Sequence, residues 1–146
     1  MKIKLDKGAY MPTRAHVTDA GLDIYTPKEL YINATTKDLF GQPIISSCIV
    51  DTGVHIAIPE GYVGFIKSKS GLNVKKGLIA EGVIDSGYTG SIVVKLYNLS
   101  DKCHAFAPGE KIAQLVLIPI ITPTLELVNS LEETERGDNG FGSTGK

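Results

Sequence analysis

Short runs of apolar and β-branched residues, separated by glycine and proline, recur along most of the chain. Residues 54–58 alternate apolar and polar side chains, and Glu60-Gly61 then provides a turn before a second apolar run at 62–66. Residues 92–99 and 112–118 are further runs of strand length. A repeat of two residues is that of a β-strand with one buried face, whereas a helix repeats every 3.6 residues. The chain is therefore expected to be an all-β protein.

The order of these runs predicts which strands are neighbours. Residues 54–59 and 62–66 are expected to form one hairpin, and the turn-rich stretch 30–51 a variable hairpin at the surface. Residues 125–128 are expected to form a last short strand, following prolines that restrict pairing to sheet edges. Residues 72–77 are the one candidate for a helix, and that helix would be short.

Length, charge and cysteine usage restrict the class of protein. A chain of 146 residues with 42% hydrophobic content suits one domain with a single core. A formal charge of −1 argues against a broad basic face, so no direct binding of nucleic acid is expected. Cys48 and Cys103 form no C-x-x-C pair, which indicates reduced thiols and a cytoplasmic location. Neither a signal peptide nor a membrane-spanning segment is expected.

The stretch 82–90, Gly-Val-Ile-Asp-Ser-Gly-Tyr-Thr-Gly, brings one carboxylate to a tight turn. The apolar residues on either side are expected to pair as strands, with Asp85 first in the turn and Tyr88 three residues later. Taken alone, such an aspartate commonly serves the turn by bonding nearby backbone N–H groups. The alternative is a catalytic aspartate. Because no Ser-His or Cys-His arrangement is evident, a water nucleophile aided by one general base would be the economical mechanism for a hydrolase.

Other polar residues stand at the ends of predicted strands. Residues 67–72 alternate lysine and serine before a glycine, which indicates either a solvated loop or a phosphate cradle. Asp23, between two apolar neighbours, is either a solvent-facing acid or part of a site. Gln114, within an apolar run, is either a core amide bonded to backbone or a ligand contact. His55 is expected to be solvated, because it lies on the face opposite its apolar neighbours.

The last eleven residues, 136–146, differ in composition from the rest, with four glycines and one aromatic residue. The sequence thus divides into a β domain, 1–135, and a flexible Gly-rich C-terminal arm, 136–146. Residues 140–146 fit G-x-x-x-x-G-K, but no Ser or Thr and no helix follow, so we reject a P-loop. The arm carries a guanidinium, an aromatic ring and a Gly/Ser/Thr backbone, which suit phosphate, base and oxygen atoms of a nucleotide.

Five separated segments resemble, in order, the five motifs of the trimeric dUTPase family. The resemblance covers nearly the whole chain, and five ordered motifs are far more specific than any single one. The segments are 20–24 (Ala-Gly-Leu-Asp-Ile), 69–72 (Lys-Ser-Gly-Leu), 82–90, 109–115 (Gly-Glu-Lys-Ile-Ala-Gln-Leu) and 136–145. The resemblance implies a distorted jelly-roll subunit of the β-clip kind. It also implies a homotrimer with shared active sites, and Mg²⁺-dependent hydrolysis of dUTP to dUMP and pyrophosphate, which keeps uracil out of DNA and supplies dUMP for dTMP synthesis.

The resemblance also implies roles for particular residues. The carboxylate of Asp85 would activate the water that attacks the α-phosphorus, Tyr88 would lie against the deoxyribose, and Asp23 would reach Mg²⁺ through a water. The remaining substrate contacts would come from Lys69, Ser70, Gly71 and Gln114 at the phosphates, Arg136 at the terminal phosphate, and Phe141 on uracil, with Gly142, Ser143 and Thr144 in the closing arm.

The pairing edge of uracil is consistent with this reading. It presents acceptor, donor and acceptor, which the backbone from Ile79 to Gly82 can match without polar side chains, and cytosine reverses two of those groups. Thymine would be excluded by the bulk of its methyl group and a ribose 2′-OH by crowding against Tyr88. The triphosphate adds about four negative charges, so a divalent ion is needed, and Mg²⁺ typically arrives through phosphates and waters.

Two other functions remain in view. The dCTP deaminases have a similar Asp-x-Gly-aromatic hairpin, but their deaminating glutamate would fall near Lys95, and lysine cannot act as that carboxylate. A catalytically silent nucleotide sensor on the same scaffold would use the stretch 30–51 as its contact surface. The sequence departs from the family at Lys69, where arginine is common, so the planar two-pronged donor is lost. It also departs in the length of the stretch 30–51.

Overall fold

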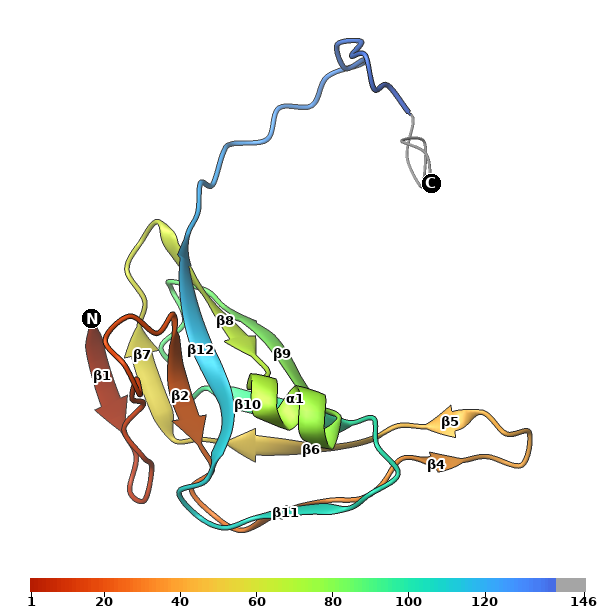
Figure 1. Ribbon diagram of the computed structural model, residues 1–146. Coiled ribbons are helices and arrows are strands. Elements are labelled where there is room, and N and C mark those ends of the chain that lie inside the picture. The colour runs from red at the N-terminus through yellow and green to blue at the C-terminus, as the bar shows by residue number, and fades with distance from the viewer. Residues whose placement is uncertain (139–146) are drawn as a thin grey trace.

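The computed structural model describes residues 1–138, and its centre is one six-stranded sheet (Figure 1). The strands lie in the order β2-β12-β8-β9-β10-β6, and every neighbouring pair is antiparallel. Their bounds are β2 (Gly21–Tyr25), β6 (Ser46–Asp51), β8 (Tyr62–Lys67), β9 (Leu78–Ile84), β10 (Val93–Asn98) and β12 (Lys111–Pro119). The sheet curls into half a barrel. The expected all-β, jelly-roll class is confirmed.

Three two-stranded ladders complete the fold. They are β1 (Lys2–Leu5) with β7 (Val54–Ala57), β3 (Leu30–Ile32) with β11 (His104–Phe106), and β4 (Thr36–Lys37) with β5 (Pro43–Ile44). The first two ladders lie beside the large sheet, whereas β4 and β5 project away from it (Figure 1). The core is a cluster of buried aliphatic side chains between these elements, including Ile24, Val50, Ile66, Leu96 and Leu115, each at most 1% exposed. Their burial is the main favourable term for folding.

The helix α1 (Ser70–Lys76) connects β8 to β9. It ends because Gly77 takes the left-handed conformation, with φ of 67°, and its N–H donates to the carbonyl of Asn73. Lys75 and Lys76 in the last turn are favourable with the helix dipole. The expected short helix is thus present, and it begins two residues before the predicted start. None of the helical segments in residues 1–138 is long and apolar enough to cross a membrane.

Three expectations about strand pairing are wrong. β7 pairs with β1 and β8 pairs with β12 and β9, so the two strands joined by Glu60-Gly61 do not form a ladder with each other. Within 30–51 only residues 36–44 form a projecting hairpin, because β3 and β6 pair with β11 and β10. Residues 125–128 form no strand, because no described strand lies against them. In each case a partner distant in sequence decides the pairing.

Candidate active site

A buried carboxylate between two ammonium groups forms the first part of the site. Asp23 on β2 has a side chain that is 8% exposed; the Lys69 ammonium bonds its Oδ1, and the Lys111 Nζ lies 2.7 Å from its Oδ2. Burial raises the pKa of Asp23, but the hydrogen bonds from Lys111 and Lys69 together hold it below its ordinary value. Asp23 is therefore ionised, and it fixes the ammonium of Lys69 at the start of α1.

Gln114 joins this cluster to the loop before the helix. On β12 it lies opposite Asp23 and Lys67, and its Nε2 donates to the carbonyl of Ser68 at 3.0 Å. A Cβ on Gly21 would lie 2.1 Å from the Gln114 Oε1, so the glycine is what leaves room for the amide. This contact is the one expected of a core amide bonded to backbone, the first of the two sequence interpretations. Through it, Gln114 positions the loop that bears Lys69.

Only part of the Lys-Ser alternation in residues 67–72 faces solvent. Lys67 forms an ion pair with Glu81, and the Ser68 hydroxyl bonds the backbone N–H of Ala80 at 2.9 Å. Ser70 and Gly71 are exposed at the first two positions of the helix. The polar groups available to an anion on this side are therefore those of residues 69–71.

The second part of the site is the outer half of β9. Residues 78–80 pair with residues 96–98 of β10, but residues 81–84 pair only with β8. The edge of β9 that faces β10 thus lacks a ladder partner from residue 81 onward. Among the predicted uracil contacts, Ile79 lies in the paired part opposite Tyr97, and Gly82 lies in the open part. Backbone N–H and C=O groups of such an edge are available to a ligand.

Asp85 directly follows this open edge. The predicted turn is present, since the N–H of Tyr88 donates to the carbonyl of Asp85 at 3.0 Å, but the strand ends beside it do not pair. Residues 85–92 therefore form a wide loop and not a tight hairpin. The Asp85 side chain is exposed, and no hydrogen bond or ion pair of its carboxylate occurs within residues 1–138. The phenol of Tyr88 donates to the carbonyl of Ser91 at 2.8 Å and lies over Gly90. An unpaired exposed carboxylate is free to accept a proton from water.

The two parts of the site lie far apart in one chain. Ser68 contacts Ala80 near the beginning of β9, whereas Asp85 lies five residues further along. At about 3.3 Å per strand residue, this separates the 69–71 loop from Asp85 by about 16 Å. One copy therefore carries two half-sites that it does not bring together.

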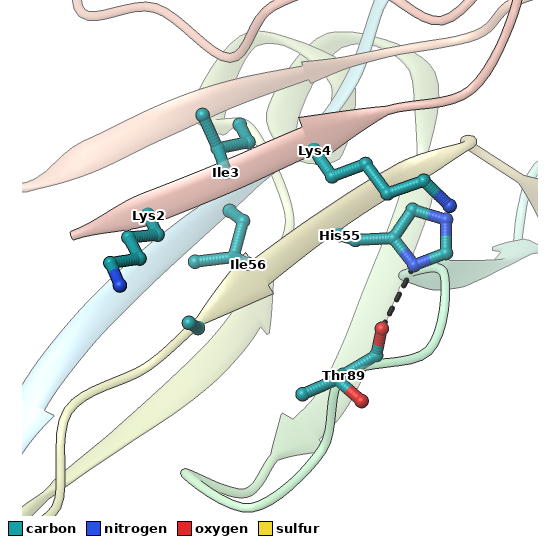
Figure 2. A pocket seen from close by; sticks show the side chains of 7 residues that line it. Lys2, Ile3, Lys4, His55, Ile56 and Thr89 are labelled. Carbon is teal, nitrogen blue, oxygen red and sulfur yellow. Dashed lines mark hydrogen bonds between the residues drawn. The ribbon is translucent and has the colours of Figure 1, made fainter.

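Other predicted residues lie outside both half-sites. Arg136 is exposed in the segment that follows β12, and Phe141, Gly142, Ser143 and Thr144 lie outside the described residues. Sequence reasoning gave no role to Lys111, although it is one of the two partners of Asp23. It also predicted a solvated His55, but that ring is 18% exposed. It bonds Thr89 (Figure 2) and also Asp6. No local pattern signals these contacts, because the partners are distant in sequence.

Metal-binding capacity within residues 1–138 is limited. No group of three or more His, Cys, Asp or Glu side chains there could hold a metal ion. Asp23 keeps accepting capacity on both oxygens, since each oxygen has two lone pairs and one lysine contact. The described residues therefore suit a metal ion that Asp23 contacts through a water better than one enclosed by protein ligands alone.

The fold and the two half-sites define an all-β nucleotide-binding enzyme with one exposed carboxylate beside an open strand edge. A family model described as dUTPase matches residues 7–145. The chain belongs to the dUTPase family.

Individual relatives agree over the full length. The deoxyuridine 5'-triphosphate nucleotidohydrolase of Corynebacterium jeikeium is 43% identical over 150 residues, covering 98% of this chain and 90% of its own. A solved mutant dUTPase of Staphylococcus bacteriophage 80alpha with dUpNHpp has a TM-score of 0.85 at 32% identity, covering 99% of this chain and 98% of that one. A dUTPase mutant from phage phi11 of S. aureus, described as revealing a structural Mg(II) ion, has a TM-score of 0.76 at 31% identity, covering 90% and 98%.

Proposed function

We propose that the chain hydrolyses dUTP to dUMP and pyrophosphate, with Asp85 as the general base that deprotonates the attacking water. The carrying observation is the exposed, unpaired carboxylate of Asp85 at the end of the open edge of β9, in a chain of the dUTPase family. A nucleotide whose base lies on that edge would have its sugar and α-phosphate beside the loop 85–92. The water then loses its proton to Asp85 as its oxygen attacks the α-phosphorus, and pyrophosphate leaves.

Backbone groups recognise the uracil base, and the shape of the site excludes other nucleotides. The open part of β9, including Gly82, offers N–H and C=O groups to the pairing edge of uracil, with Ile79 at the margin where β10 separates. Gly82 has no side chain there, and an added Cβ would meet only Ile66 at ordinary contact distance, so the chain itself does not demand the glycine. We attribute the glycine to the ligand. Tyr88, in the loop 85–92, would exclude a ribose hydroxyl by crowding.

The phosphates are bound by the other half-site. Ser70 and Gly71 donate hydrogen bonds, Lys69 supplies positive charge while held by Asp23, and Gln114 keeps the loop in place. Mg²⁺ bound mainly through the phosphates would neutralise part of the triphosphate charge, and Asp23 would contact it through a water. Arg136 and the arm, with Phe141, Gly142, Ser143 and Thr144, would close over the terminal phosphate and the base.

Separation of the half-sites supports an oligomer with shared active sites, which we propose to be a homotrimer. Asp85 of one copy can serve a substrate whose phosphates lie on the 69–71 loop of another, whereas the same two groups in one copy are about 16 Å apart along β9. The division at residue 135 follows from the same proposal, since the arm would reach a neighbouring copy. The free Cys48 and the exposed free Cys103 support a reducing, cytoplasmic location.

The direct test is pyrophosphate release from dUTP, dTTP, dCTP and UTP by the full chain. We expect release from dUTP alone, and Asp85→Asn should retain nucleotide binding while its turnover falls at least about a hundredfold. Asp101→Asn, at an exposed loop acid, is the matched control and should leave turnover unchanged. Ammonia released from dCTP would instead show a deaminase. A protein that binds dUTP without releasing pyrophosphate would be a sensor.

A further inference from the structure

A histidine outside both half-sites contacts the loop that carries Asp85. His55 lies on β7, and its ring reaches across a pocket of about 230 Å³ toward Thr89 (Figure 2). The ring Nδ1 lies 2.9 Å from the carbonyl oxygen of Thr89, and the ring Nε2 lies 3.0 Å from Oδ2 of Asp6. The imidazole thus links the segment after β1 to the loop 85–92.

Both atoms that face the ring are hydrogen-bond acceptors. A neutral imidazole has one N–H, so it can donate to the carbonyl or to the carboxylate but not to both. Only the imidazolium, with an N–H on each nitrogen, satisfies the two contacts together. If the ring loses one proton, the N–H facing Asp6 is the one retained, because a hydrogen bond to an ionised acceptor is roughly twice as strong. Loss of charge therefore releases Thr89.

The rest of the loop is held unevenly. Its end is tied to the sheet, since the Ser91 hydroxyl bonds Asp51 and the N–H of Ile92 donates to the carbonyl of Val54 at 2.8 Å. Its middle, residues 87–90, has glycine at both ends and is exposed or half-exposed. Apart from the Tyr88 bonds within the loop, the described contact of this middle part with another element is the one from Thr89 to His55.

We propose that His55 is a positioning residue for catalysis: as an imidazolium bridging Asp6 and the Thr89 carbonyl, it holds the loop that carries Asp85 and Tyr88 in its working position. This inference rests on the proposed role of Asp85. The effect is indirect, since His55 contacts the backbone one residue after Tyr88 and leaves the substrate to the loop itself. A displacement of about 1 Å at a reacting group is enough to lower a rate by about a hundredfold.

The charges around the ring favour its protonated form. The hydrogen bond to Asp6, and after it the one to Thr89, raise the pKa of His55 above its ordinary value, and partial burial and the nearby Lys4 oppose this. Lys4 also pairs with Asp6 at 3.2 Å, Lys2 lines the same pocket, and Asp51 contributes a further negative charge. The bridge is therefore complete below the ordinary histidine pKa of about 6.5 and is lost as the pH rises through the higher folded-state value.

Three substitutions of the same residue separate the two bonds. The amide nitrogen of His55→Asn overlaps the ring Nδ1 and keeps the bond to Thr89; that of His55→Gln overlaps Nε2 and keeps only the bond to Asp6; His55→Ala keeps neither. His16→Asn is the control, because the His16 side chain is exposed and has no hydrogen bond within residues 1–138. Steady-state hydrolysis of dUTP by the full chain is measured from about pH 6 to pH 9.

We expect His55→Ala and His55→Gln to lower kcat/KM about tenfold at neutral pH, mainly through kcat, and His55→Asn to stay within about threefold of the wild type. The wild type and His16→Asn should share a fall in kcat at high pH that His55→Asn lacks. Equal kcat/KM in His55→Ala and the wild type, or in His55→Gln and His55→Asn, overturns the proposal. Because the Asn and Gln variants are both polar, their comparison stays decisive if the alanine variant fails to fold.

A nuclear magnetic resonance titration of the His55 ring protons separates this proposal from the proposed function. The wild type should titrate above the ordinary histidine pKa, and Asp6→Asn should lower the pKa of His55. A wild-type protein that releases no pyrophosphate from dUTP would refute the function, whatever the ring does. A ring that titrates at or below the ordinary histidine pKa refutes the bridge, even in an active enzyme.

Discussion

Replacing Gly21 by alanine tests how the 69–71 loop, the proposed phosphate-binding loop, is held. The new Cβ would lie 2.1 Å from the Gln114 Oε1, 2.9 Å from its Cδ and 3.1 Å from its Cβ. An ordinary contact begins at 3.4 Å, so the amide end must retreat by about 1.3 Å. Its Nε2 cannot then stay 3.0 Å from the carbonyl of Ser68. The loop that carries Lys69 then loses its side-chain bond to β12 and keeps only the ladder of β8 with β12.

The size of the effect follows from these contacts. Loss of the half-buried hydrogen bond removes about 1 kcal/mol, and a strained Gln114 rotamer adds about 1 kcal/mol. Alanine in place of glycine returns roughly 0.5 kcal/mol through the unfolded state, since Gly21 has no positive φ. We therefore expect Gly21→Ala to lower the free energy of unfolding by about 1.5 kcal/mol and to lower kcat/KM for dUTP.

Urea unfolding of the Gly21→Ala, Gln114→Ala and double variants, at one protomer concentration, measures this coupling. In the Gln114→Ala background the Gly21→Ala change should have little effect, because the amide that it displaces is gone. Gly71→Ala is the stability control, since an added Cβ there meets no atom within 4 Å. Additive effects of the two changes, or an unchanged free energy of unfolding in Gly21→Ala, would refute the reasoning.

Three further predictions concern the loop, the buried acid and the metal. Gly90→Ala places a Cβ 2.4 Å from the Tyr88 hydroxyl, so we expect the bond to Ser91 to break and the KM for dUTP to rise about tenfold in steady-state kinetics, with little change in unfolding. The lowered pKa of Asp23 gives stability that is present above its unfolded pKa of 3.8 and is lost as the pH falls through the lower folded value. The wild type should therefore lose unfolding free energy faster than Asp23→Asn between about pH 5 and pH 3 in urea titrations. EDTA should abolish pyrophosphate release but leave the thermal unfolding midpoint unchanged, since residues 1–138 contain no cluster of three metal-binding side chains; a lowered midpoint would reveal a structural ion.

Local sequence patterns predicted which segments are strands, but pairing depended on distant partners. The alternation at 54–58 correctly marks β7, because it reports one buried face. It contains no information on whether the edges of that strand pair with β1 or β8, and the structure pairs β7 with β1. The helix α1 was predictable because its stop signal, Gly77, is local. Residues 125–128 alternate like a strand, yet without a partner the pattern alone forms none.

The candidate site divides in the same way. Asp85, the 69–71 loop and Asp23 could be proposed from the sequence because the residues of each motif are contiguous, and their roles stay predictions. The contacts of Asp23 and His55 could not be predicted from local patterns. Lys111 reaches Asp23 from the neighbouring strand, and Asp6 is 49 residues from His55. The width of the loop 85–92 was also missed, because it results from the β9–β10 ladder being limited to residues 78–80 and 96–98, which the apolar pattern does not signal.

The segment after β12 exposes several large apolar side chains to solvent in a single copy. Between residues 120 and 138 the backbone has neither helix nor strand and extends away from the sheet (Figure 1), while Ile121, Leu125, Leu127 and Leu131 are 86% to 101% exposed. An exposed apolar segment of this kind favours association with another surface that buries it. In the proposed homotrimer, this segment would be covered only at protomer concentrations that allow assembly. A protease added to the dissociated protein would therefore cut the segment and spare the sheet.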